Sequence, residues 1–238
     1  MNITYINHSC FLAELEERLL LFDYYSEGLE REGILPGIKE LPDKPLYAFV
    51  SHKHRDHFDR KLFELEKVHP QVSYILSKDA KMNESYMRRI DIPESAFTKI
   101  QYIGKRETRM PEEGMRVTTL ASTDAGVAFL IETEGKVMYH AGDLNWWSFS
   151  GQTAEEEKSM EKRFKQEIDR LAGISIDVAF LPLDPRQEER FFLGFDYFMK
   201  NTDTKLAYPM HFWGDRSVIG RLKEMEISEE YRDRIMEI

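Results

Sequence analysis

The sequence predicts an α/β protein in which two layers of β-sheet form the core and helices lie outside them. Short apolar runs that are typical of strands occur in two blocks, and segments of helical periodicity follow each block. The chain has no internal repeat, low-complexity tract or linker, so we expect one domain over residues 1–238. Hydrophobic residues make up 42% of the chain, which is enough to bury a core of this size.

Four expected strands make up the first block. They span residues 2–6, 10–15, 18–25 and 46–51, and polar or Gly/Pro turns separate them. The segment 28–45, between the third and fourth strands, is rich in Gly, Pro and charged residues and predicts a long loop. Apolar residues then recur at a helical spacing over residues 57–68, and Pro70 closes the expected helix.

Strands and helices alternate through the rest of the chain. Strands are expected at residues 73–77, 96–104, 115–122, 126–143, 175–184 and 205–212, with a hairpin turn at Glu134-Gly135. Helices are expected at residues 78–90, 153–172, 186–202 and 215–226. For the helix over 153–172, Thr153 and Glu156 supply a capping-box pattern, and apolar residues recur on one face behind them.

Charge and cysteine content narrow the expected partners and compartment. The net charge of −10 argues against a nucleic acid or an anionic membrane as the main partner, because either would be repelled over most of the surface. Cys10 is the only cysteine, and the first residues lack the pattern of a secretory signal. No uncharged apolar run approaches the roughly 18 residues of a membrane span. We therefore expect a cytoplasmic protein, and a homo-oligomer remains open.

The segment "VSHKHRDHFD", residues 50–59, carries three histidines within six residues and an aspartate beside the last of them. It follows an expected strand and precedes an expected helix, and such turns hold functional side chains well. Side chains two residues apart in an extended segment project to the same side, so His52 and His54 can reach one ion. Asp56 and His57, after the turn, can face a second ion. The alternative is a solvated, polar helix start.

The donor types indicate which ion the cluster would bind. Imidazole and carboxylate donors without thiolate suit Zn²⁺, Mn²⁺ or iron, and the chain lacks the set of cysteines that a purely structural zinc site uses. We expect one or two divalent ions as cofactor, with zinc the first candidate and manganese or iron as alternatives.

The motif "HKHRDH" resembles the His-x-His-x-Asp-His signature of the metallo-β-lactamase fold hydrolases. Other segments fall in the order of that family: "ITYINHSCFLAEL" and "LLLFDYY" at the start, then "VMYHAGDLN", and "YPMHF" near the end. The chain looks closest to the branch that includes L-ascorbate 6-phosphate lactonase and its uncharacterised bacterial relatives. The resemblance implies an αββα sandwich, in which two mixed sheets pack face to face with helices outside and the metal site lies at one edge.

The resemblance also implies six metal ligands. The first metal would take His52 and His54, the second would take Asp56, His57 and His211, and Asp143 would bridge both. Asp143 and His211 each stand near the end of an expected strand, where a side chain can point toward the shared edge of the sheets. The alternatives are that Asp143 is an ordinary turn residue and that His211 is an ordinary packed histidine. Asp23 resembles the family's aspartate beneath the histidine loop, where a carboxylate orients a ligand imidazole.

One ligand of the family is missing from this chain. The family places a further histidine before the bridging aspartate, but no histidine occurs between His69 and His140. Ser122, Thr123 or Asp124 stands in that stretch, and Asp124 alone offers the charge that a hard cation prefers; a plain turn residue is its alternative. Three consequences are possible. Asp124 or water completes the first metal position, or only the second position holds a metal, or the site has lost its catalytic activity. We expect the second position to bind more tightly.

Two residues are expected to act on protons. Asp56 would hold or receive a proton from the metal-activated water. His8 resembles the histidine in the branch's Gly-His-Ser segment and would serve the leaving oxygen, with a polar strand-end residue as its alternative. His140 is expected to support the site or to pack, and His69 is expected to face solvent.

Two further pairs are candidates for the walls of the pocket. One ring of Trp146 and Trp147 can line it, with core packing or a partner surface as the alternative. Arg186, next to Asp184, can hold a phosphate or carboxylate, with a structural salt bridge as the alternative.

Together these residues predict a metal-dependent hydrolase that uses metal-activated water on a small-molecule ester, lactone or phosphoester. The alternative is a metal-binding, catalytically impaired member of the fold that acts as a sensor or interaction module, and the missing histidine favours it. A nuclease of the same fold is disfavoured by the acidic net charge.

Overall fold

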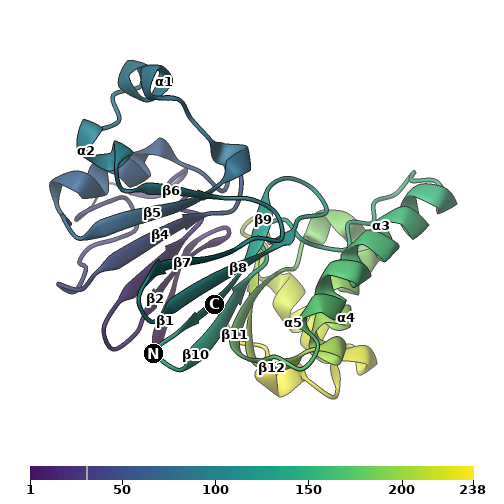
Figure 1. The fold of residues 1–238 in the computed structure, drawn as a ribbon. Coiled ribbons are helices and arrows are strands. Elements are labelled where there is room, and N and C mark those ends of the chain that lie inside the picture. Colours follow the sequence, from purple (N-terminus) through teal and green to yellow (C-terminus); the bar gives the residue numbers. More distant parts are fainter. Residues whose placement is uncertain (31) are drawn as a thin grey trace.

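Two six-stranded sheets pack face to face, and helices cover their outer surfaces (Figure 1). The computed structural model describes residues 1–30 and 32–238, and all structural statements apply to those ranges. The expected αββα sandwich is confirmed. Residue 31, within the expected loop 28–45, lies outside the described residues. In the described ranges, no helix combines the length and the apolar character that crossing a bilayer requires.

The first sheet comes from the first block of the chain. Its strand order is β1 (Asn2–Asn7), β2 (Cys10–Glu14), β3 (Leu19–Phe22), β4 (Leu46–Val50), β5 (Val72–Ser77) and β6 (Ile100–Ile103). β1 to β3 run antiparallel and β3 to β6 run parallel, so the sheet is mixed. The four strands expected in this block are confirmed. The third ends earlier than expected because Asp23 turns the chain with a φ of 41°.

The second sheet comes from the second half of the chain. Its strand order is β12 (Asp203–Met210), β11 (Ser175–Pro182), β10 (Lys136–His140), β9 (Val127–Thr133), β8 (Met115–Ala121) and β7 (Thr108–Glu112). β7 to β10 run antiparallel and β10 to β12 run parallel, so this sheet is also mixed. The expected hairpin joins β9 to β10 through Glu134-Gly135.

Two apolar clusters hold the layers together. Side chains alternate across the first sheet, so Leu20 and Phe22 enter the core between the sheets, whereas Leu19 and Leu21 face the outer helices. All four are fully buried. A sheet that is covered on both faces needs apolar residues at every position, which explains the unbroken run "LLLF". The sheets meet directly where the rings of Phe22 and His140 stack with centroids 5.0 Å apart.

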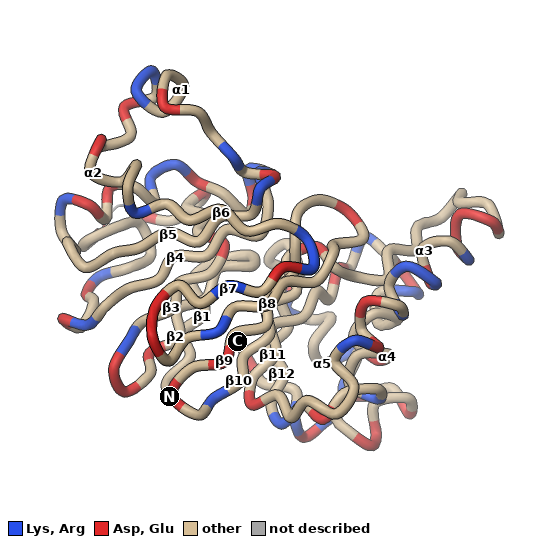
Figure 2. The backbone as a smooth tube through the Cα atoms, viewed as in Figure 1, with Lys and Arg blue, Asp and Glu red and all other residues tan. Residues whose placement is uncertain are grey.

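The helices beside the first sheet are short, and the long helices α3 (Ala154–Ile168) and α4 (Leu193–Asn201) lie beside the second sheet. The 3₁₀ helices η1 (Arg60–Lys67) and η2 (Lys78–Ala80) and the helices α1 (Glu84–Arg89) and α2 (Glu94–Phe97) accompany the first sheet. The second sheet is accompanied by α3, η3 (Asp169–Leu171), η4 (Pro185–Arg190), α4, α5 (Ser217–Glu224), η5 (Glu226–Ser228) and η6 (Arg232–Arg234). The capping box of Thr153 and Glu156 starts α3 as expected. Acidic and basic residues alternate along α3 (Figure 2).

The helix expected over residues 57–68 is wrong at its start. It begins at Arg60 with 3₁₀ geometry, because the Asp59 side chain caps it by accepting a hydrogen bond from the backbone N–H of Lys61. His57 instead belongs to a turn, in which its backbone N–H donates to the carbonyl of His54 at 3.0 Å. The histidine cluster therefore sits in a loop that can fold around a ligand.

Two other expected helices are interrupted. The segment 78–90 divides into η2 and α1, because Asn83 caps a new helix by accepting from the N–H of Tyr86. The segment 186–202 divides into η4 and α4, and Glu188, with a φ of 53°, kinks η4 near its centre. Apolar periodicity runs through both breaks, so it did not reveal them.

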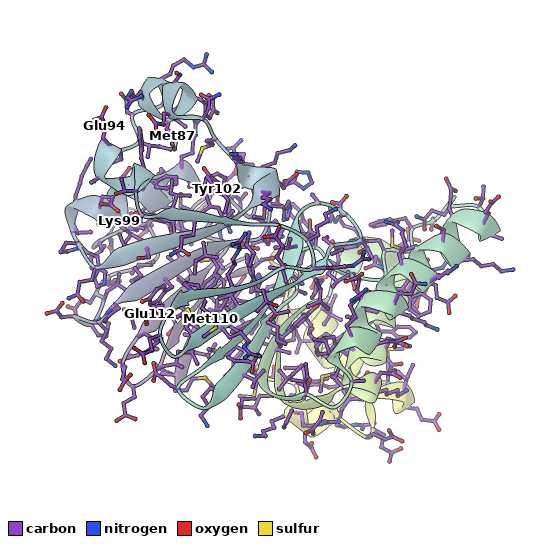
Figure 3. All side chains as sticks on the ribbon, viewed as in Figure 1. Met87, Glu94, Lys99, Tyr102, Met110 and Glu112 are labelled. Carbon is purple, nitrogen blue, oxygen red and sulfur yellow. The ribbon has the colours of Figure 1, made fainter. Side chains whose placement is uncertain are left out.

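The strand expected over residues 96–104 is also partly wrong, since α2 occupies its start and β6 covers only its end. β7 was not expected, because the charges and the proline in "TRMPE" are unusual in strands. β7 is an edge strand, where a proline costs no ladder hydrogen bond. Met110 and Glu112 lie along it (Figure 3). Glu112 accepts a hydrogen bond from Tyr47 of β4 and pairs with Arg18 at 2.7 Å, which ties the two sheets together.

Candidate metal centre

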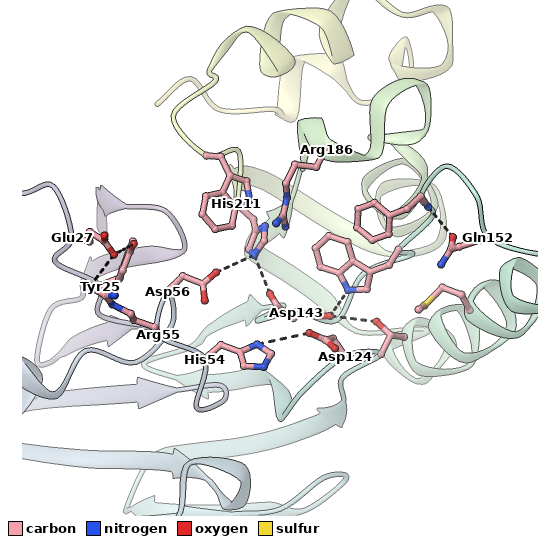
Figure 4. Close-up of a pocket in the computed structure, with 15 residues that line it drawn as sticks. Tyr25, Glu27, His54, Arg55, Asp56, Asp124, Asp143, Gln152, Arg186 and His211 are labelled. Atoms are coloured by element: carbon pink, nitrogen blue, oxygen red, sulfur yellow. Dashed lines mark hydrogen bonds and ion pairs between the residues drawn. The ribbon is translucent and has the colours of Figure 1, made fainter.

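Loops that leave five strands bring polar side chains to one edge of the sandwich. His8 follows β1, the histidine cluster follows β4, Asp124 follows β8, Asp143 follows β10 and His211 follows β12. Figure 4 shows side chains from both sheets converging on a single pocket. Rigid strands fix where each loop starts, and the loops are then free to present their side chains.

Asp23 organises the turn that carries the histidine cluster. Its carboxylate accepts hydrogen bonds from Ser51 N at 2.7 Å, Ser51 Oγ at 2.6 Å and His57 Nδ1 at 2.8 Å. Ser51 Oγ also lies 2.9 Å from Nδ1 of His52. Burial alone would raise the pKa of Asp23, but His140 and His57 outweigh burial and hold the pKa below its ordinary value. His52 and His57 are thus fixed through Nδ1 and present Nε2 to the site.

Asp143 lies at the centre of the site. Its Oδ1 is 3.1 Å from Nε2 of His57 and 3.4 Å from Nε2 of His211, and its Oδ2 is 3.2 Å from Nε2 of His52. Burial would raise the pKa of Asp143, but His57 and the neighbouring imidazoles outweigh burial and hold the pKa well below its usual range. The indole of Trp147 donates to the Asp143 carbonyl at 3.0 Å. Oδ1 therefore faces the imidazoles of His57 and His211, and Oδ2 faces that of His52.

Asp184 orients His211 from beneath. The carboxylate is fully buried and accepts a hydrogen bond from Nδ1 of His211 at 2.9 Å. Burial would raise its pKa, but the bonds from His211 and Arg186 outweigh burial and lower the pKa of Asp184 to about 2. The sequence offered a salt bridge with Arg186 as one alternative for Asp184, and that salt bridge forms. The signal for the second role was an aspartate directly after a buried strand, at the edge where the other site residues lie.

A second group of donors surrounds Asp56. Its Oδ2 is 3.3 Å from Nε2 of His8, 3.8 Å from Nε2 of His57 and 3.8 Å from Nε2 of His211. One donor atom from each of these four residues lies within 4.8 Å of the others. Burial lowers the pKa of His8 to about 4, despite the adjacent Asp56. His8 is therefore a neutral imidazole at pH 7.

Unpaired buried atoms show that this donor set fits a cation. The atoms are Nε2 of His8, His52 and His57 and Oδ1 of Asp143, which have no hydrogen-bond partner among the described residues. Each such atom costs about 1–3 kcal/mol unless something in the site pairs with it. A histidine that donates through Nδ1 leaves a lone pair on Nε2, which is the usual form of a histidine ligand. The residues present thus fit a divalent metal.

Asp124, in the loop after β8 where the resemblance places the missing histidine, lies beside His54. Its Oδ2 lies 3.9 Å from Nδ1 of His54, and together with Asp143 these residues offer three donor atoms within 4.8 Å. Its two neighbours are engaged in the loop, since Ser122 Oγ accepts from the N–H of Asp124 and Thr123 Oγ1 donates to a backbone carbonyl at 2.7 Å. Of the three residues considered from sequence, Asp124 is the one whose side chain approaches the histidines.

A pocket of about 670 Å³ opens above these groups (Figure 4). His54, Asp56, Asp124, Asp143 and His211 form its polar floor. Its walls include the side chains of Trp147, Phe149, Met160 and Trp213. Arg186 also lines the pocket, with its guanidinium 4.5 Å from the centre of the Trp213 ring. Such a mixture of apolar walls and a few polar groups is typical of small-molecule sites.

Sequence comparison identifies the family. Residues 2–158 match the profile of the β-lactamase superfamily domain. The chain belongs to the β-lactamase superfamily. No curated protein matched the chain in a sequence comparison.

Solved structures share the fold of this superfamily member. A candidate metal-dependent hydrolase from Parabacteroides distasonis aligns with a TM-score of 0.64 at 18% identity, over 98% of this chain and 90% of its own. Igni18, described as a novel metallo hydrolase from Ignicoccus hospitalis, aligns with a TM-score of 0.65 at 16% identity, over 99% and 94%. CmlA, a diiron β-hydroxylase from Streptomyces venezuelae, aligns with a TM-score of 0.58 at 16% identity, over 88% of this chain and 44% of its own.

The structure also places the remaining candidate residues of this superfamily member, and one of them differs from the sequence prediction. His69 does not face solvent: it is buried, and its Nε2 lies 2.8 Å from the carbonyl oxygen of Lys44, so it ties η1 to the segment before β4. His140 packs on Phe22 and contacts the carbonyl of Ser9 at 2.9 Å. Of the two tryptophans, Trp147 lines the pocket.

Proposed function

We propose that the chain is a metal-dependent hydrolase that cleaves an ester, lactone or phosphoester bond of a small molecule. The observation that carries this proposal is the arrangement around Asp143, whose two oxygens face the buried imidazoles of His52 and His57, each with an unpaired Nε2 atom. Membership of the β-lactamase superfamily supports it. The branch that includes L-ascorbate 6-phosphate lactonase is a prediction within the same proposal.

The proposed cofactor is one or two divalent ions, with zinc the first candidate and manganese or iron as alternatives. The proposed ligands are His52, His54, Asp56, His57, Asp143 and His211. An ion in such a set lowers the pKa of bound water toward about 7 and polarises a carbonyl or phosphoryl oxygen.

The side chains of the chain divide the remaining work. Asp56 is partly exposed to the pocket and has an oxygen near three imidazoles, so it is placed to take a proton from an attacking water. Burial lowers the pKa of His8, and its Nε2 lies 3.3 Å from Oδ2 of Asp56, so this imidazole is placed to serve the leaving oxygen of the substrate beside Asp56. Trp147 and Trp213 exclude water from the apolar side of the substrate.

The pocket supports a small-molecule substrate. Its volume of about 670 Å³ falls in the range of roughly 300–1,000 Å³ that is usual for such sites. Two arginines that line the pocket can contact an anionic group of the substrate. Arg186 is paired with Asp184, and Arg55 is paired with Glu27 at 3.4 Å. A large polyanion is a poor fit to a chain with a net charge of −10.

Metal analysis followed by a substrate screen tests the proposal. Protein purified without chelator is analysed for bound metals, and is then assayed with esters, lactones and phosphodiesters in the presence of Zn²⁺ or Mn²⁺. The double variant Asp56→Asn/His57→Ala is expected to lose bound metal and at least about 100-fold in turnover. Its circular dichroism should stay native. A double variant that is inactive but keeps the full metal content would contradict the ligand roles of these two residues.

The same experiment separates the enzyme from its alternative. A protein that binds metal but hydrolyses none of these bond types would favour a metal-binding sensor or interaction module. The missing histidine is the feature that favours the sensor or interaction module. The carboxylate of Asp124, beside His54, favours the enzyme.

A further inference from the structure

The position that lost its histidine is the part of the site in which this chain departs from its superfamily. We propose that Asp124 is a metal ligand that completes the first position beside His52, His54 and the shared Asp143, and that this set of two imidazoles and two carboxylates shifts the first position from Zn²⁺ toward harder ions such as Mn²⁺ or Fe²⁺. The inference rests on the metal site of the proposed function, and it is independent of turnover.

The distances suit a shared ion. Two ligands that each lie about 2.0–2.2 Å from one ion are at most about 4.4 Å apart. Oδ2 of Asp124 and Nδ1 of His54 are separated by 3.9 Å. The rings of His52 and His54 are neighbours, with centroids 4.6 Å apart. Asp143 joins both groups, because it belongs to the donor group of His54 and Asp124 and also to that of His52 and His57.

An independent observation points to a ligand at the same place. Nε2 of His52 is buried, has no hydrogen-bond partner among the described residues, and lies 3.2 Å from Oδ2 of Asp143. Nδ1 of the same ring is already engaged with Ser51. The ring therefore keeps a free lone pair on Nε2, beside the Asp143 carboxylate that also belongs to the donor group of His54 and Asp124.

Gly126 forces the loop of Asp124 against the loop of the histidines. Its φ is 66°, and a Cβ at this residue would lie 1.9 Å from the carbonyl oxygen of Ser51. The next residue, Val127, donates its N–H to that same oxygen at 3.0 Å. Only glycine permits both the backbone conformation and the close approach. The distance from Asp124 to His54 is thus set by packing of the backbone.

The opposite side of the loop is anchored to α3. Arg163 donates to the carbonyl of Thr123 at 3.0 Å, and the buried Glu167 accepts from the N–H of Ala121 at 2.9 Å. Thr123 Oγ1 also accepts from the N–H of Asn145 at 3.1 Å, which links the loop to the segment after Asp143. Anchors on both sides hold the loop, so the half-exposed side chain of Asp124 starts from a fixed backbone.

The charges around Asp124 favour a cation. Among the described residues its ion-pair partner is His54, and no lysine or arginine pairs with it. Asp124, Asp56 and Asp143 are the three carboxylates in the polar floor of the pocket. Carboxylate oxygens suit hard cations, whereas a third imidazole suits zinc.

Manganese binding by the metal-free protein tests the inference. Mn²⁺ is titrated into wild type and Asp124→Ala, and free Mn²⁺ is followed by electron paramagnetic resonance. Wild type is expected to bind a pair of ions whose shared Asp143 couples their spins, whereas Asp124→Ala should hold one magnetically isolated ion. Loss of an outer-layer partner costs about 10–100-fold in affinity, so loss of a direct ligand should weaken the first position at least about 100-fold.

Two further variants separate ligation from charge. Asp124→His restores the ligand type of the family and is expected to change the ratio of Zn²⁺ to Mn²⁺ affinity at the first position at least about tenfold in favour of zinc. Glu27→Gln removes a carboxylate from the pocket rim that belongs to no donor group, and it should change Mn²⁺ affinity by less than about twofold. Circular dichroism establishes that each variant is folded.

The possible results are distinct. Unchanged Mn²⁺ binding in Asp124→Ala overturns the inference and leaves the proposed function standing. An unchanged ratio in Asp124→His overturns the shift toward hard ions. Wild type that binds no metal at all overturns both the inference and the proposed function.

Discussion

The two halves of the candidate metal centre share Asp143 but differ in how firmly their other residues are held. Around the second position the side chains of His57 and His211 are 0% and 3% exposed, and Asp23 and Asp184 fix their rings. Around the first position His52 is also fully buried, but the side chains of His54 and Asp124 are 46% and 55% exposed. The rigid half suits permanent retention of an ion, and the open half suits exchange of ions and contact with substrate.

The largest expected effect comes from removing what the halves share. Asp143→Asn keeps the shape of the side chain but removes the charge that both positions face. We expect metal affinity to fall at least about 1,000-fold at both positions, since this ligand loss acts on each of them. Isothermal titration with Zn²⁺ measures the loss. If one position kept its affinity, Asp143 would serve only the other.

A single added methyl group should disrupt the close contact between the loop of Asp124 and the loop of the histidine cluster. Gly126→Ala is expected to lower the free energy of unfolding by about 3 kcal/mol or more, because it adds a clash with Ser51 to an unfavourable φ. Gly135→Ala is the matched control, since its φ of 67° is similar and nothing lies within 4 Å of its added Cβ. Its cost should be about 1 kcal/mol. Urea unfolding of the metal-free proteins compares them, and equal costs would mean that the contact is not tight.

The two supporting carboxylates should act on different halves. Asp184→Asn is expected to weaken the second position about 10–100-fold and to spare the first, because Asp184 contacts only His211 among the proposed ligands. Asp23→Asn should weaken both, because Asp23 reaches His57 directly and His52 through Ser51. Competition between Zn²⁺ and a chromogenic chelator resolves the two affinities. Equal losses in the two variants would contradict this division.

The smallest expected effect is a pH dependence. The folded-state pKa of Asp184, about 2, is below its unfolded value, so its ionised form stabilises the fold. That stability is present above about pH 4 and is lost as the pH falls through about 2. We expect Asp184→Asn to flatten this part of the acid unfolding curve of the metal-free protein by about 1 kcal/mol. Identical slopes in the two proteins would show that the carboxylate gains nothing from His211.

Local patterns predicted more of the fold than of the element boundaries. Strands such as β3 and β4 were found because apolar runs bounded by turns are a property of neighbouring residues. The break at Asn83 and the kink at Glu188 were missed, because a cap or a positive φ leaves the apolar spacing intact. β7 was missed because an edge strand tolerates the proline and charges that a central strand excludes.

The candidate site divides in the same way. His52, His54, Asp56 and His57 stand within six residues, so their spacing and chemistry alone suggested a metal. Asp143 and His211 came from resemblance to a family, since nothing local to either one marks it as a ligand. Asp184 was assigned only to its neighbour Arg186, because its contact with His211 spans 27 residues of sequence.

By itself, the sequence determined the chemistry of the donors, the composition of the strands, and the absence of a third histidine, because these are properties of residues and their near neighbours. Only the tertiary structure decided which of the three residues in that stretch has a side chain that approaches the histidines. Ser122, Thr123 and Asp124 are equivalent in position along the chain. The choice among them depends on a backbone contact between Gly126 and Ser51 and on anchors from α3, which exist only once both sheets have packed.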